Sequence, residues 1–229
     1  MIAIRKSHDR GHFNFGWLDT YHSFSFGDYH DSKHMGFRTL RVINEDVIEP
    51  GQGFPLHGHR DMEIITYILK GELEHRDSLG NIGKIQTGEF QTMTAGTGIR
   101  HSEYNASQKQ SCHLLQIWIQ PEKSDLKPGY EQKIFEESEQ SLQLLASPDL
   151  KGGLLINQDI KLYLGRMKET EKQSLVFSTN RHAWIQIIRG SLFVNGLQLE
   201  SGDGAAISSE SQLLFESVTS CEFLVFDLN

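Results

Sequence analysis

A chain of 229 residues with 38% hydrophobic and 23% charged residues has the composition of a folded protein of one large or two small domains, which excludes a disordered chain. The net charge of −8, with no Lys/Arg cluster on an aromatic-rich stretch, argues against direct nucleic-acid binding. There is no apolar run of signal-peptide or membrane-span length, and the 2 cysteines are too few for a disulfide-stapled fold. We therefore expect a cytoplasmic protein that contacts no membrane.

The predicted elements are strands. Short runs rich in β-branched and aromatic residues are bounded by Gly, Asn, Asp and Ser, which is typical of an all-β sandwich or barrel. These runs are IITYIL (64–69), HLLQIWI (113–119), AWIQII (183–188), SLFV (191–194), GAAI (204–207) and EFLVFDL (222–228). The Glu-rich stretch 130–143 follows the turn-like DLKPG (125–129) and could hold a short helix. We predict an N-terminal domain over 1–125, a linker with room for a short helix over 126–140, and a C-terminal domain over 141–229.

The two halves of the chain share an order of features. In the first half, a strand ends at Gly71, a hairpin follows, and an acidic turn carries Gly88. In the second half, a strand ends at Gly190, a hairpin turns at Asn195-Gly196, and an acidic turn carries Gly202. A weak repeat of this kind predicts two copies of one β-fold, although any β protein can repeat strand, Gly and strand.

Two histidine-containing pairs suggest a metal site. His57 and His59 are two residues apart on a predicted strand, so both side chains face one side. With 11 histidines, one such pair has about an even chance of arising at random, so the spacing alone is weak. His101 and Glu103 repeat the spacing, and two such pairs on adjacent strands would converge on one ion. Three neutral imidazoles and one carboxylate suit one divalent transition metal ion. A six-coordinate ion would keep two positions free for substrate and O₂, which favours Fe(II) over Zn, Ni, Cu, Mn or Co.

Two stretches resemble the motifs of cupins. GQGFPLHGHRDMEIITYILKG resembles the first motif, although its last gap is one residue longer than usual, and the matching positions are Gly51, His57, His59, Glu63 and Gly71. GEFQTMTAGTGIRHSEYN resembles the second motif, with Thr94 where a proline is usual and a longer segment before the histidine, and its matching positions are Gly88, Gly96, His101 and Asn105. The long AGTGIRHSE loop and the residues leading into the first motif resemble the pirin family, particularly its bacterial quercetinase-like members.

The resemblance implies two tandem cupin domains, each a jelly-roll β-barrel or sandwich. It also implies metal ligation by His57, His59, His101 and Glu103. In the wider cupin pattern Glu63 would be the carboxylate ligand, so two assignments compete. The His-x-Glu spacing matches the pirin form and favours Glu103, which would also serve as the catalytic general base or as a ligand alone. Glu63 is then expected to orient a ligating histidine. The C-terminal domain lacks both motifs and is expected to be a degenerate cupin without metal.

The five histidines among the first 34 residues have spacings too irregular for a second metal site. The neighbouring aromatic stretch suits either a wall above the metal or an ordinary packed strand, and its residues are Tyr21, His22, Phe24 and Phe26. We expect His75 to face solvent and Cys112 to be a buried structural cysteine that begins a strand. Alternation along 113–119 places Gln116 and Trp118 on one face and His113 on the other.

The resemblance implies an enzyme: a metal-dependent dioxygenase of the quercetin 2,3-dioxygenase type that cleaves a flavonol. Its partners would be a small aromatic substrate and O₂, and the chain would act as a monomer. The alternative is a non-enzymatic metal- or redox-sensing protein that acts through protein partners. A third hypothesis keeps the enzyme but exchanges the flavonol for another enolisable or aromatic compound. A cavity that admits a substrate would separate the first hypothesis from the second.

Overall fold

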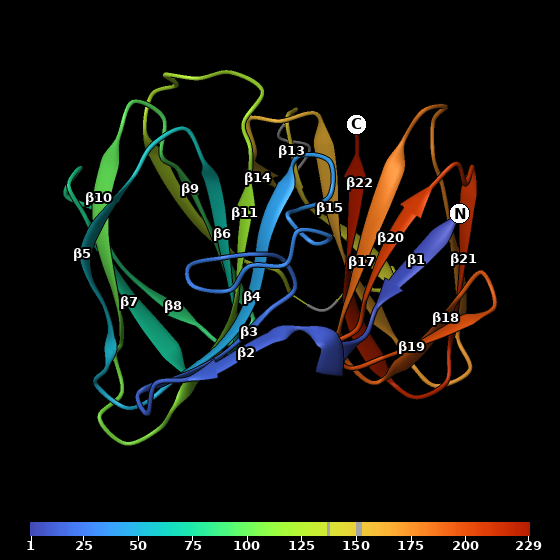
Figure 1. Ribbon diagram of the computed structural model, residues 1–229, viewed down its shortest axis with the longest axis horizontal. Helices are drawn as coiled ribbons and strands as arrows, with labels where there is room; N and C mark the ends of the chain where they lie inside the picture. The colour runs from blue at the N-terminus through green and yellow to red at the C-terminus, as the bar shows by residue number, and fades with distance from the viewer. Residues whose placement is uncertain (137, 150–152) are drawn as a thin grey trace. The chain divides into compact units, whose positions relative to one another are not determined.

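The computed structural model describes residues 1–136, 138–149 and 153–229, and it confirms the predicted all-β class (Figure 1). Within these residues the only helical element is the 3-10 helix η1 (Ser7–Asp9). The described part of the chain therefore contains no helix that is long and apolar enough to cross a membrane. The residues form two compact units. The N-terminal unit comprises Gly11–Glu136 and Leu154–Gln158, and the C-terminal unit comprises Met1–Arg10, 138–149, Gly153 and Asp159–Asn229.

The N-terminal unit consists of two antiparallel sheets, in the orders β12-β9-β6-β11-β4-β3-β2 and β5-β10-β7-β8. The strands of these sheets are β2 (Gly11–Asn14), β3 (Leu18–His22), β4 (Leu40–Ile48), β5 (Gly53–His59), β6 (Glu63–Lys70), β7 (Glu72–Asp77), β8 (Ile82–Gln86), β9 (Glu89–Thr94), β10 (Ile99–Asn105), β11 (Cys112–Ile119) and β12 (Gly129–Ile134). The unit also contains the short strand β14 (Leu154–Leu155), which belongs to neither of these two sheets. Apolar side chains from both sheets pack into one core cluster, which includes Ile48, Ile68, Leu73, Ile85 and Leu114.

The C-terminal unit repeats this plan, in the orders β1-β20-β17-β22-β15-β13 and β16-β21-β18-β19. Its strands are β1 (Ile2–Arg5), β13 (Leu142–Ser147), β15 (Ile160–Met167), β16 (Lys172–Val176), β17 (His182–Arg189), β18 (Ser191–Val194), β19 (Leu197–Glu200), β20 (Gly204–Ser208), β21 (Gln212–Ser217) and β22 (Cys221–Leu228). All eight residues of β22 are buried, so this strand lies at the centre of the unit's core. Figure 1 shows the blue strand β1 beside the orange-red strand β20.

The internal repeat predicted from the glycine pattern is confirmed by the strand orders. The small sheet β5-β10-β7-β8 corresponds to β16-β21-β18-β19, and the central strands β9-β6-β11-β4 correspond to β20-β17-β22-β15. The turn glycines that suggested the repeat share a left-handed backbone, with φ of +85° at Gly71 and +81° at Gly190. Each of the two therefore ends its strand with a backbone conformation that only glycine adopts without strain.

Two features differ from the expected division of the chain. The short helix expected in the linker is wrong for residues 129–134, because these residues form the edge strand β12, which pairs with β9. Polar residues are common on an edge strand, where one side faces water, and this explains its helix-like composition. Residues Met1–Arg10 belong to the C-terminal unit rather than to the N-terminal domain, since β1 pairs with β20. Residue 137 of the predicted linker and residues 150–152 of the predicted C-terminal domain lie outside the described residues.

Substitution of two turn glycines should separate backbone strain from steric conflict. Gly71 and Gly88 have nearly equal φ values, +85° and +87°, but a Cβ at Gly71 would lie 2.8 Å from the carbonyl oxygen of Ser111, whereas a Cβ at Gly88 meets no atom within 4 Å. We expect Gly88→Ala to lower the free energy of unfolding by about 1–2 kcal/mol. Gly71→Ala should lower it by about 1–3 kcal/mol more, because the backbone must move. Urea denaturation measures both losses, and equal losses would contradict this explanation.

Candidate metal centre

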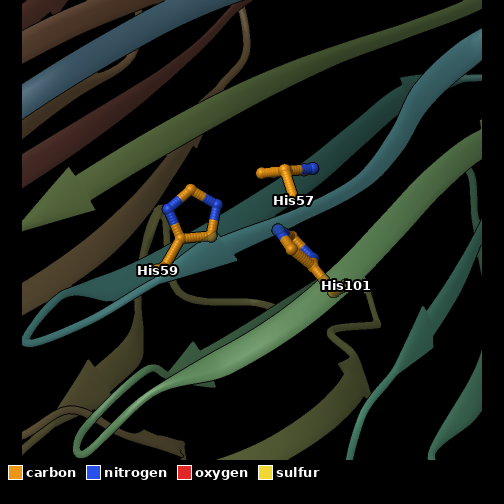
Figure 2. Close-up of side chains that lie close together, drawn as sticks. All are labelled: His57, His59 and His101. Atoms are coloured by element: carbon orange, nitrogen blue, oxygen red, sulfur yellow. The ribbon is translucent and has the colours of Figure 1, made fainter.

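Three of the predicted ligands come together where β5 pairs with β10. His57 and His59 lie on one face of β5, and His101 of β10 is the antiparallel partner of His57. One nitrogen of each ring lies within 4.8 Å of one nitrogen of each of the others. Figure 2 shows the three rings gathered in the space beside these two strands. The ring centroids are 4.4 Å apart for His57 and His101, and 5.0 Å apart for His59 and His101.

Glu103 lies two residues beyond His101 on the same strand. The pairing of β10 with β5 shifts register between His101 and Glu103, an irregularity that redirects side chains near functional sites. The carboxylate is 1% exposed, and its Oε2 accepts a hydrogen bond of 2.9 Å from Nε2 of Gln116. Glu103 and His101 also form a second close group with His75, whose ligand atoms lie within 4.8 Å of one another. The predicted carboxylate therefore lies close to one of the predicted histidines, His101.

Two of these histidines, His59 and His101, are neutral over a wide pH range. Burial, with a further contribution from the neighbouring imidazoles, lowers the pKa of His59 to about 4 and that of His101 to about 3. A neutral imidazole has one nitrogen lone pair to offer to a metal ion. Nδ1 of His57 lies 2.8 Å from the carbonyl oxygen of Pro55, which can only accept, so the lone pair of His57 is on Nε2.

The donor atoms fit a metal ion. Among the described residues, Nε2 of His101 and Oε1 of Glu103 are buried and have no hydrogen-bond partner. A buried polar atom without a partner carries a free-energy cost, and at a functional site it indicates an atom reserved for a ligand or an ion. Imidazole nitrogens and one carboxylate oxygen form a donor set that suits divalent iron, nickel, zinc, copper, manganese or cobalt.

A cavity of about 410 Å³ opens onto these donors, and His57, His59 and Glu103 line it. Its apolar walls are formed mainly by Phe13, Phe15, Leu18, Phe26, Phe54 and Trp118. The rings of Trp118 and His59 form a T-shaped pair with centroids 4.8 Å apart, and those of Phe26 and Trp118 form another at 5.2 Å. This volume and this mixture of aromatic walls with a few convergent polar groups are typical of a small-molecule site.

The aromatic stretch near the N-terminus contributes only part of this wall. His22 and Phe26 line the cavity, as one of the two interpretations of this stretch proposed. Phe24 is buried at 2% exposure, and Tyr21 stacks on His12 with ring centroids 4.2 Å apart, so neither lines the cavity. The stretch is thus partly cavity wall and partly packed structure.

One polar group of the cavity wall, Asp46, was not predicted from the sequence. Asp46 lies in the wall with Thr20 and Asn44, and the hydroxyl of Thr20 donates to Oδ1 of Asp46. Burial raises the pKa of Asp46 to about 7; the hydrogen bond from Thr20 opposes this rise, and the negative charge of Glu103 adds to it. Alternation along β4 could have predicted that Asn44 and Asp46 face inward, because both share the parity of the buried residue Ile48.

Glu63 does not take its expected place beside a histidine. Its Oε2 accepts hydrogen bonds from the hydroxyl of Thr94 at 3.1 Å and from the backbone N–H of Asn157 at 3.1 Å. Glu63 pairs with Ile119 and the next residue pairs with Trp118, so Glu63 faces away from the cavity. The alternation that held on β5 does not extend to Glu63, because β6 belongs to the other sheet.

The expectation that His75 faces solvent is wrong. His75 is 0% exposed, its Nδ1 lies 3.4 Å from Nδ1 of His101, and its Nε2 lies 3.2 Å from Oδ2 of Asp77. The missed signal was again alternation, because His75 has the parity of the buried Leu73 on β7.

Strand β11 matches its predicted pattern. Gln116 and Trp118 both line the cavity, whereas His113 lies on the other face and its Nε2 is 3.0 Å from Oε1 of Glu45. Cys112 begins the strand and is fully buried, as predicted, and burial raises the pKa of its thiol to about 12.

The stability of the metal-free protein should depend on the neutral histidines. An imidazole in an unfolded chain has a pKa near 6.5, whereas His101 has a pKa of about 3 in the fold. As the pH falls below about 6.5, the unfolded chain therefore binds a proton that the folded chain does not, and the free energy of unfolding decreases.

We expect His101→Asn to make this decrease shallower, by up to about 1.4 kcal/mol per pH unit between pH 6 and 4. Asp46, whose raised pKa acts in the opposite direction, is present in both proteins. The difference between the slopes therefore reports His101 together with its contribution to the lowered pKa of His59. Urea denaturation at several pH values measures the slopes, and parallel slopes for the two proteins would contradict this assignment.

Comparison with known proteins agrees with this architecture. The Pirin family model matches residues 3–119, and the model described as "Quercetinase C-terminal cupin domain" matches residues 144–228. The chain is 48% identical over 229 residues to a protein of Escherichia coli (strain K12) named quercetin 2,3-dioxygenase, covering 100% of this chain and 99% of that protein. It is 36% identical to a pirin-like protein of Caulobacter vibrioides, covering 97% of this chain and 98% of the relative.

Among solved structures, the bacterial pirin YhhW of Escherichia coli in complex with nickel(II) superposes with a TM-score of 0.96 at 48% identity, covering 100% of this chain and 99% of that one. The strand orders, the repeated unit and these full-length matches agree on two tandem cupin domains. The chain belongs to the pirin family.

Proposed function

We propose that this protein is a metal-dependent dioxygenase that opens the ring of a flavonol such as quercetin with O₂ and releases carbon monoxide. The observation that carries the proposal is the aromatic cavity that ends on clustered imidazoles and a buried carboxylate with an unpartnered oxygen. The names of the Escherichia coli relatives support the same class of reaction. A metal- or redox-sensing protein that acts only through protein partners would not need a cavity of this kind.

The proposed ligands of a single divalent ion are His57, His59, His101 and Glu103. Nε2 of His57, Nε2 of His101 and Oε1 of Glu103 are the atoms that the hydrogen bonds leave for it. We propose Fe(II), because four protein ligands leave two of its six positions for substrate and O₂. The nickel(II) complex belongs to the Escherichia coli relative and supports a divalent transition metal in general.

The bound ion would act as a Lewis acid and lower the pKa of a substrate hydroxyl held against it. Glu103 would receive the proton of that hydroxyl at Oε1, because its other oxygen accepts a hydrogen bond from Gln116. Gln116 is held in turn by Trp118, whose indole N–H donates to Oε1 of Gln116 at 3.3 Å. This chain of hydrogen bonds fixes the carboxylate while leaving one oxygen free to bind the ion or the proton.

The walls of the cavity would bind and orient a flat aromatic substrate. Phe13, Phe26 and Trp118 present ring faces and edges, and aromatic pairs of this kind favour planar ligands. A bound substrate would displace water from the donors, which would strengthen electrostatic interactions inside the cavity. The hydroxyl groups of a flavonol would find acceptors at Asn44 and Glu103, each of which has a buried oxygen without a partner among the described residues.

The cytoplasmic location and the monomeric state of the protein stay predictions.

The proposal predicts flavonol cleavage that depends on the cluster. Protein loaded anaerobically with Fe(II) and quercetin should release carbon monoxide in proportion to the quercetin consumed once O₂ is added. His101→Ala and Glu103→Ala should each reduce the rate by at least about 100-fold, since each removes a ligand and, for Glu103, a base. Gas chromatography of carbon monoxide and the loss of quercetin absorbance measure the rate.

His113→Ala serves as the matched control, because His113 is also paired with a carboxylate but lies outside the cavity. It should keep the parent rate. If His101→Ala and Glu103→Ala cleaved quercetin as fast as His113→Ala and the parent, the assignment of His101 and Glu103 to the catalytic site would be wrong. One ion per chain with no O₂ consumption on quercetin would instead favour the metal-sensing function, and O₂ consumption on other enolisable compounds alone would favour a different substrate.

A further inference from the structure

A buried chain of polar side chains continues behind His101, away from the cavity. On β7, Asp77 is the cross-strand partner of His101, and His75 is the partner of Glu103. These four side chains project from the same face of two adjacent strands, so they lie close together. The side chains of His75 and Asp77 are both 0% exposed. Two buried ionisable groups in direct contact need an explanation, and neither lines the cavity.

Asp77 is held as an anion. Its Oδ1 accepts hydrogen bonds from the backbone N–H groups of Leu79 at 2.9 Å and Asn81 at 3.0 Å, and its Oδ2 accepts from Nδ2 of Asn81 at 2.8 Å. Burial raises the pKa of Asp77, but these bonds, together with that from His75, outweigh burial and lower it. The donors surrounding the carboxylate leave it only the role of acceptor toward His75.

The protons of the chain then have one consistent arrangement. Because Asp77 can only accept, Nε2 of His75 carries its proton and donates to Oδ2 at 3.2 Å. The Nδ1 of a neutral His75 is therefore an acceptor, and its neighbour at 3.4 Å, Nδ1 of His101, must be the donor. The remaining nitrogen of His101, Nε2, holds the lone pair, and it is the buried nitrogen without a hydrogen-bond partner among the described residues.

We infer that Asp77 and His75 are positioning residues that fix His101 as its Nδ1–H tautomer, with Nε2 presented to the metal ion. The inference rests on the ligand set of the proposed function. His57 is held in the same tautomer, because its Nδ1–H donates to the carbonyl oxygen of Pro55. The partner of His57 is a neutral backbone group, whereas that of His101 ends in a carboxylate charge. This charge makes the imidazole a stronger donor toward a cation.

The geometry favours this role over metal ligation by His75 itself. Both nitrogens of His75 are already engaged, Nδ1 with His101 and Nε2 with Asp77. Its ring also packs on Tyr130, with centroids 4.7 Å apart and an interplanar angle of 31°. The hydroxyl of Tyr130 donates to Oε1 of Gln132 at 2.9 Å. The ring of His75 is thus held on three sides at the position that supports His101.

The tautomer of His101 can be measured without metal or substrate. In long-range ¹H–¹⁵N spectra of the metal-free protein, His101 should show a protonated Nδ1 and an unprotonated Nε2. Asp77→Asn should reverse the direction of these hydrogen bonds: its oxygen would stay with the backbone N–H groups of Leu79 and Asn81, and its NH₂ group would donate to Nε2 of His75 and to the side-chain oxygen of a turned Asn81 amide. His75 would then donate from Nδ1 to Nδ1 of His101, and His101 would carry its proton on Nε2. A purely structural role for Asp77 would not produce this inversion.

Metal affinity gives the second readout. Competition with a chromophoric chelator should show nickel(II) binding about 10–100-fold weaker in Asp77→Asn and in His75→Phe than in the parent. Phe keeps the ring that packs on Tyr130 but lacks both nitrogens. His113→Asn, which breaks a His–carboxylate pair elsewhere in the same unit, should leave the affinity unchanged.

An Nε2–H tautomer of His101 in the parent protein would overturn the inference, as would unchanged nickel affinity in both variants. If His75→Phe fails to fold, Asp77→Asn decides, since it replaces one oxygen by an NH₂ group of similar size. The NMR test does not depend on flavonol cleavage. If the tautomer and its inversion are observed but flavonol is not cleaved, the proposed function alone is overturned.

Discussion

The candidate site depends on the antiparallel pairing of three adjacent strands, β5, β10 and β7. The register between β5 and β10 sets His57 opposite His101, and the register between β10 and β7 sets Asp77 opposite His101. Because side chains alternate faces along a strand, these pairings place the candidate ligands and the polar groups behind them on one face without any loop having to be ordered. A shift of one residue in either register would turn half of the site outward. The precision of the site therefore comes from the backbone hydrogen bonds of the small sheet.

The C-terminal unit shows that this frame is independent of the chemistry. Its strands β16 and β21 occupy the places of β5 and β10, yet the segments Lys172–Val176 and Gln212–Ser217 carry no histidine. The core of this unit is nevertheless complete, with β22 buried along its whole length. The same fold is thus a packed domain in one copy and, in the proposed function, a frame for metal ligands in the other, since function depends on the few side chains that project inward.

Local pattern was sufficient to predict much of the fold and part of the site. The strands, the glycine repeat and the shared face of His57 and His59 follow from periodicity along single segments. Other features depend on which strands become neighbours, which no single segment contains. Glu63 kept the parity of the histidines in sequence, but the chain enters a different sheet before it, past Asp61 in a left-handed conformation (φ +48°). The burial of His75 follows from alternation with Leu73, but its contact with His101 depends on the pairing of β7 with β10.

The central claim is that one ion is bound by three histidines and Glu103 at the end of the cavity. The most direct test is anomalous diffraction, at the iron edge, from crystals loaded anaerobically with Fe(II). This account predicts one strong peak within about 2.0–2.3 Å of Nε2 of His57, His59 and His101 and of one carboxylate oxygen of Glu103. A peak bound by Glu63, or by His75 in place of Glu103, would contradict it.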